Sequence, residues 1–189
     1  MTRWPPLAAQ GPPRPPARPR RSVLKRRVTA PLALFIILVI VFGRVYLMGT
    51  AIVVGRSMVP TLQDGDRLLM VIWGARTAVP QRLEIVSCED PTDPRSAVIK
   101  QVIGLPGEII AVRGTAVIVN DRVLDEPYAH GVIPTFIPPV RLGPDQILVL
   151  GDNRDLSEDS RDWGPISING VIGRCRMVYF PLSRATVLR

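Results

Sequence analysis

The sequence predicts a mostly β protein, in which a single apolar helix near the N-terminus precedes one all-β domain. Three observations support this fold class. Short runs of β-branched residues recur after residue 49 with turn signals between them, no sustained helical period appears in that region, and residues 28–42 carry no charge. The roughly 140 residues from Gly49 onward are enough for one compact core.

The N-terminal tail holds the excess positive charge. The formal net charge is +8, yet residues 1–28 contain eight basic residues and no acidic one, and the chain after Arg44 sets 15 basic against 16 acidic residues. The net charge of the domain is therefore −1, which argues against a nucleic-acid partner. Residues 1–27 are also rich in proline, so we expect a disordered, basic cytoplasmic tail.

Residues 28–48 are predicted to form a transmembrane helix. The uncharged run alone reaches only ~22 Å, but continuing to Met48 supplies about 21 residues for a ~30 Å hydrocarbon core, with Arg44 at the interface. The basic flank lies on the N-terminal side, so we expect a single-pass protein of the cell membrane with residues 49–189 outside the cytoplasm. A cleavable secretory signal is the alternative, because Gly49 and Ala51 form a small-x-small pattern.

Eight strands are expected in the domain, separated by turn signals such as Asp64-Gly65 and Pro106-Gly107. An inserted segment is predicted at about 108–145, and its Pro-rich part, 125–144, reads as a long surface connection or small subdomain. Cys88 and Cys175 fall in two of the strands, where they could pair in an oxidising compartment or pack as free thiols. The expected strands cover residues 51–55, 66–73, 83–88, 96–104, 108–114, 115–121, 146–152 and 170–181.

Lys100 is the first catalytic candidate. It is the only lysine among the 15 basic residues after Arg44, and an ammonium, unlike a guanidinium, can be driven to the neutral amine. Strand alternation places it on one face with Val98 and Val102, where desolvation would lower its pKa into the range of a general base. The plainer interpretation is a lysine that survives by chance on a strand surface.

Two polar segments complete the candidate site. Ser57 directly follows a strand and precedes a proline-constrained turn, a geometry that can present one hydroxyl at a strand end, although a loop serine is more often a turn residue. Residues 151–165 form a dense polar loop whose interleaved arginines and serines favour a hydrogen-bonded scaffold over a calcium site. In it, Ser157 could orient an amine, and Asp159 and Arg161 could pair.

At these residues the sequence resembles the type I signal peptidase family, membrane-anchored serine peptidases that use a Ser-Lys dyad. The resemblance covers residues 30–181 and rests on four boxes in the family's order. They are the apolar anchor, Ser-Met-x-Pro-Thr-Leu at 57–62, Lys-x-Val-Ile-Gly-Leu-Pro-Gly at 100–107, and Gly-Asp-Asn-Arg-x-x-Ser-x-Asp-Ser-Arg at 151–161.

The resemblance implies roles for particular residues. Two positions depart from the family pattern: Gly55 stands where some members carry a serine hydroxyl that helps bind the oxyanion, and Gln101 stands where arginine is common. Oxyanion binding would then rest more on backbone N–H groups. Alternation points Gln101 away from Lys100, so we expect little consequence there. The implied nucleophile is Ser57 and the implied base Lys100, with supporting residues Ser157, Asp159, Arg161, Gly55, Met58 and Pro60.

The implied activity is removal of signal peptides from exported preproteins after a small-x-small pattern, through an acyl-enzyme and without a metal or cofactor. Implied partners are signal peptides, membrane lipid and the protein-export machinery, with no nucleic acid. A Ser-His-Asp hydrolase is disfavoured because the only histidine, His130, lies in the Pro-rich connection. The alternative from another class is a catalytically inactive, membrane-tethered β-domain that binds extracytoplasmic peptides or proteins.

Overall fold

The structure is a computed structural model that describes residues 23–93, 95–113, 116–131 and 136–188. The chain divides after Val41 into two units, Met1–Val41 and Phe42–Arg189. Most of the predicted tail, up to residue 22, lies outside the described residues.

Helix α1, Val23–Leu47, occupies the apolar N-terminal stretch and contains Pro31. The large apolar side chains between Leu32 and Phe42 are about half exposed or more. In the described part of the chain, no helix combines the length and the hydropathy required to cross a membrane. The predicted span at residues 28–48 is therefore unconfirmed and stays a prediction.

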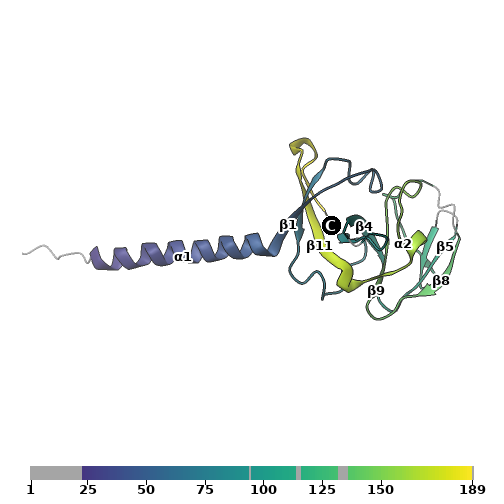
Figure 1. The fold of residues 1–189 in the computed structure, drawn as a ribbon, viewed down its shortest axis with the longest axis horizontal. Helices are drawn as coiled ribbons and strands as arrows, with labels where there is room; N and C mark the ends of the chain where they lie inside the picture. The colour runs from purple at the N-terminus through teal and green to yellow at the C-terminus, as the bar shows by residue number, and fades with distance from the viewer. Residues whose placement is uncertain (1–22, 94, 114–115, 132–135, 189) are drawn as a thin grey trace, which may run out of the picture. The chain divides into compact units, whose positions relative to one another are not determined.

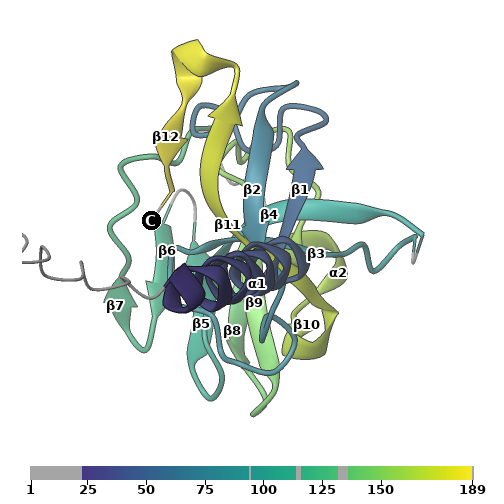
Figure 2. The same ribbon diagram turned by 90° about the vertical axis from the view of Figure 1, so that its left-hand side faces the viewer.

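The larger sheet has eight antiparallel strands in the order β1-β2-β11-β3-β4-β9-β10, with β12 paired to β11. Figure 2 shows β1, β2 and β11 side by side, with β12 next to β11. Strand β1 lies at an edge of this sheet, whereas β4 is enclosed between β3 and β9. The strands are β1 (Met48–Ile52), β2 (Arg67–Val71), β3 (Ile85–Glu89), β4 (Ala97–Gly104), β9 (Gln146–Leu150), β10 (Ile166–Ser167), β11 (Val171–Phe180) and β12 (Thr186–Val187).

The smaller sheet has four strands in the order β7-β6-β5-β8. Its strands are β5 (Ile109–Arg113), β6 (Ala116–Val119), β7 (Arg122–Val123) and β8 (Ile137–Arg141), all within the residues predicted as an inserted segment. Figure 1 shows β5 and β8 on the side of the domain away from β1. The antiparallel pairing of β5 with β6 and of β5 with β8 makes this sheet a continuous ladder.

Within residues 125–144, predicted as a long surface connection or small subdomain, the sequence analysis missed strand β8. This strand contains Pro138 and Pro139, which break the usual strand pattern, and β8 lies at the edge of the smaller sheet. A proline lacks the backbone N–H that an inner strand would need for its second neighbour, but an edge strand has only one neighbour to satisfy. The eight predicted strands are confirmed, since each overlaps an observed one.

Helices after α1 are short, in line with the absence of a sustained helical period after residue 49. They are α2 (Ser160–Trp163) and the 3₁₀ turns η1 (Ile168–Gly170) and η2 (Leu182–Arg184). Helix α2 begins at a capping box, in which the Asp159 side chain accepts from the helix backbone and Asp162 accepts from the backbone of Asp159. The cap ties the polar loop to the start of α2.

Strand β4 is buried on both faces. Val102 belongs to an apolar cluster with Val86 and Val149, whereas the neighbouring Ile103 belongs to another with Leu150. A strand covered on both sides offers little water to any polar side chain placed within it. Both cysteines, at positions 88 and 175, are buried free thiols in different clusters, so the free-thiol alternative holds.

Candidate active site

Ser57 lies in a tight turn just beyond the edge strand β1. Gly55 has φ +90°, a backbone conformation that disfavours any side chain, and its N–H donates to Asp64 Oδ1 at 2.7 Å. This conformation gives a local reason why glycine stands at position 55. Met58 is fully buried in the core and anchors the turn, whereas Pro60, which follows a cis peptide bond, is exposed.

Lys100 lies in the middle of β4 and is 3% exposed. Its Nζ donates to the Ser157 hydroxyl at 3.0 Å. Burial lowers the pKa of the Lys100 amine below its ordinary 10.5, while the negative charge of Asp159 acts in the opposite direction. The amine is therefore displaced towards its neutral form, which can accept a proton.

Ser57 and Lys100 line the same cleft, of about 220 Å³. Val54, Val98 and Trp163 supply its apolar wall. A second, apolar hollow of about 140 Å³ shares both residues and extends between β1 and the start of β4. The fold thus brings together a hydroxyl and an amine that are 43 positions apart in the chain.

The loop after β9 is held by a buried ion pair. Asp159 is fully buried and accepts from Arg161 Nε at 2.8 Å and Arg161 NH2 at 2.9 Å. Burial alone would raise the pKa of Asp159, but hydrogen bonds from Arg161 and from the Gly151 N–H hold it below its usual value. Arg161 also donates to the Ser157 carbonyl at 2.9 Å, so the pair fixes the backbone that carries the partner of Lys100.

Two contacts of this loop escaped the sequence analysis. A Cβ on Gly151 would lie 2.1 Å from Ser157 Oγ and 2.6 Å from the Ser57 carbonyl, so only glycine fits there. The Asn153 N–H donates to that same Ser57 carbonyl at 3.0 Å. The glycine that opens the 151–161 box was a usable signal, because a glycine inside a polar motif often marks a close backbone approach.

Asp152 is another buried ionisable group in the loop after β9. It is 1% exposed, and among the described residues its carboxylate forms no ion pair. Burial raises the pKa of Asp152 to about 6, although Thr61 and the charge of Arg154 act to lower it. Arg154 does not neutralise it directly, because its guanidinium pairs with Glu126 at 2.7 Å.

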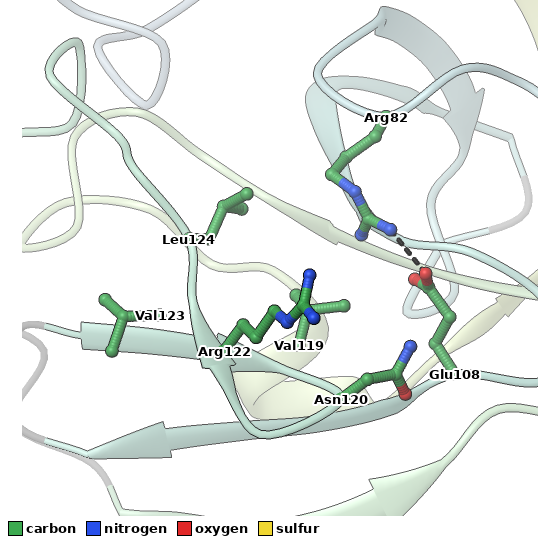
Figure 3. Close-up of a pocket in the computed structure, with 7 residues that line it drawn as sticks. All are labelled: Arg82, Glu108, Val119, Asn120, Arg122, Val123 and Leu124. Carbon is green, nitrogen blue, oxygen red and sulfur yellow. Dashed lines mark hydrogen bonds and ion pairs between the residues drawn. The ribbon is translucent and has the colours of Figure 1, made fainter.

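A larger pocket lies elsewhere and contains none of the predicted site residues. This Arg82 pocket, of about 470 Å³, lies beside β6 and β7 (Figure 3). Arg82 and Glu108 form an ion pair across it, and Arg122 extends into it from β7. Its lining is Arg82, Glu108, Val119, Asn120, Arg122, Val123 and Leu124. We place the candidate site in the smaller cleft, because that cleft, unlike the Arg82 pocket, joins a hydroxyl to a buried amine.

An all-β domain with a serine hydroxyl and a buried lysine amine in one cleft indicates a serine hydrolase. Comparison with known families narrows this class. Residues 26–180 match the family model described as signal peptidase, peptidase S26. The chain therefore belongs to the peptidase S26 family of signal peptidases, and the predicted family is confirmed.

Individual relatives agree with the family. The chain is 40% identical over 138 residues to a probable signal peptidase I-2 from Synechocystis, covering 70% of this chain and 63% of the relative. It is 32% identical over 184 residues to signal peptidase I from Leptolyngbya laminosa, covering 90% and 89%. A crystal structure of a signal peptidase I from Enterococcus faecalis aligns with TM-score 0.43 and 28% identity, over 50% of this chain and 95% of that one.

Proposed function

We propose that this protein is a serine endopeptidase that removes signal peptides from exported preproteins. The observation that carries the proposal is the buried Lys100 amine, bonded to Ser157 and lying in one cleft with Ser57. The family supports the same activity, since the relatives are named signal peptidases.

In the proposed mechanism, neutral Lys100 takes the proton of the Ser57 hydroxyl while Oγ attacks the carbonyl carbon of the scissile peptide. The resulting ammonium gives its proton to the departing amine, which leaves an ester between Ser57 and the signal peptide. Lys100 then takes a proton from the water that attacks this ester and gives it to Ser57 Oγ as the ester bond breaks, which releases the signal peptide with a C-terminal carboxyl group and restores the neutral amine. Backbone N–H groups, including that of Ser57, bind the oxyanion, because Gly55 offers no hydroxyl.

The supporting residues act through Lys100 and the turn of Ser57. The Ser157 hydroxyl orients the amine, and the Asp159–Arg161 ion pair holds the backbone of Ser157. Met58 anchors the turn in the core, and Pro60 restricts its backbone.

The proposed substrate is an extended chain with small side chains at the first and third positions before the cut. The apolar hollow between β1 and β4 measures only about 140 Å³, which favours alanine-sized groups. Because β1 lies at a sheet edge, its backbone can add a substrate strand whose hydrogen bonds set the register.

We further propose that residues 28–48 anchor the protein in the cell membrane, with residues 1–27 cytoplasmic and residues 49–189 outside. The support is the uncharged run and the basic N-terminal flank. Anchoring the enzyme and the signal peptide in one bilayer raises their effective concentration. Membrane lipid and the protein-export machinery are then the natural partners besides the preprotein.

The test is cleavage of a synthetic peptide whose signal ends in Ala-x-Ala by the purified full-length protein. The wild type should cut after the second alanine and react with a serine-directed acylating inhibitor, whereas Ser57→Ala should do neither. The rate should rise as Lys100 loses its proton, with a midpoint below pH 10.5. An uncut peptide and an unlabelled Ser57 would favour the inactive binding domain.

A further inference from the structure

The cleft has charged residues at the variable positions of its motifs. Arg56 precedes the Ser-Met-x-Pro-Thr-Leu box, and Glu158 fills the x position between Ser157 and Asp159. Both side chains are exposed and line the cleft. Within the described residues, neither has a hydrogen-bond or ion-pair partner, so both charges are available to a bound substrate.

Asp90 adds a second negative charge to the cleft. Its carboxylate accepts from the Thr92 hydroxyl at 2.7 Å, the Thr92 N–H at 2.8 Å and the Ser96 hydroxyl at 3.3 Å. The Thr92 bonds lower the pKa of Asp90, so it stays ionised at neutral pH. The cleft lining therefore carries two fixed negative charges and one positive charge.

The negative charge of Glu158 acts on the Lys100 amine. Burial lowers the pKa of Lys100, and Glu158 is among the negative charges that raise it again. A substrate side chain next to the scissile bond must lie close to Ser57, and hence within the field of Glu158.

We propose that Glu158 is a specificity-determining residue that discriminates by charge between substrate side chains flanking the scissile bond, with Arg56 acting in the opposite sense. The inference rests on the proposed function. Glu158 disfavours an acidic side chain and favours a basic one, whereas Arg56 does the reverse. One exposed pair between a cleft charge and a substrate charge changes the preference for a basic over an acidic side chain by about three- to fivefold.

The experiment measures kcat/KM of the full-length protein on peptides that share one Ala-x-Ala signal. Each peptide carries Lys, Gln or Glu at one position, either the second before the cut or the first or second after it. Relative to wild type, Glu158→Gln should lower the Lys-to-Glu preference about three- to fivefold at one or more positions, and Arg56→Gln should raise it. Both shifts should shrink in high salt.

Asp121→Asn is the matched control. It removes one negative charge at the β6–β7 turn, away from the cleft lining, and asparagine tolerates its φ of +64°. An equal shift of the Lys-to-Glu preference in Asp121→Asn would overturn this inference, and so would an unchanged preference in Glu158→Gln at every position. Either result would leave the proposed function standing. If the wild type leaves every peptide uncut, the proposed function fails and this inference fails with it.

Discussion

The cleft around Lys100 and the Arg82 pocket differ in what they do with a positive charge. In the Arg82 pocket, the larger of the two, the Arg82 side chain is 25% exposed and forms an ion pair with Glu108 (Figure 3). In the cleft, Lys100 is buried against a neutral hydroxyl, and its charged form is disfavoured. The comparison teaches that the volume of a pocket is a poor guide to where the reaction takes place. The burial of a single amine is a better guide.

The largest expected effect comes from exchanging the two basic residue types. Lys100→Arg keeps a positive charge but cannot supply a neutral amine, so peptide cleavage should fall by at least about a hundredfold in a folded protein. Arg82→Lys, the reverse exchange in the other pocket, should leave cleavage unchanged. Turnover assays with circular dichroism measure both, and retained activity in Lys100→Arg would end the dyad hypothesis.

The next effect tests the close packing that only the cleft requires. Gly151→Ala should lower kcat by up to about a hundredfold, because its new methyl group would displace Ser157 and the Ser57 backbone. We also expect roughly 1–3 kcal/mol of destabilisation from overpacking. Gly170→Ala is the control, since no atom outside its own turn and chain neighbours lies within 4 Å of the added Cβ. Equal kinetics in the two variants would contradict the packing argument.

A third prediction concerns Asp152, the buried carboxyl that follows Gly151 in the loop after β9. Its pKa is about 6 in the folded protein against an ordinary 3.8, so the native state binds the proton more tightly than the unfolded state does. The associated stability is fully present below pH 3.8 and is lost as pH rises through 6, amounting to roughly 3 kcal/mol.

Asp152→Asn keeps the carboxyl shape without the charge, so it should be the more stable protein at pH 7. Denaturant unfolding between pH 4 and 8 measures the difference. A wild type whose stability stays level from pH 4 to 7, or a variant that follows the same curve, would count against the buried charge.

The smallest effect is expected in the Arg82 pocket. Arg82→Gln removes a partly exposed ion pair with Glu108, which should cost about 1 kcal/mol or less and leave cleavage unchanged. Thermal unfolding and the peptide assay measure it. A tenfold loss of turnover would show that this pocket belongs to the reaction after all.

The sequence by itself determined the strands, because β-branched runs and turn residues act locally. It also pointed to Lys100 and Ser57 as candidates, since one lysine among arginines and one serine ahead of a proline turn are visible without coordinates. The sequence did not predict β8, because its two prolines break the usual strand pattern and its pairing depends on β5, which is distant in the chain.

Only the tertiary structure decided how the groups meet. The bond from Lys100 to Ser157 joins residues 57 positions apart, and the tight fit at Gly151 depends on two loops packing together. Local propensity carries no information on such contacts. Burial on both faces of β4 likewise arises from packing, and that burial disfavours the charged amine of Lys100.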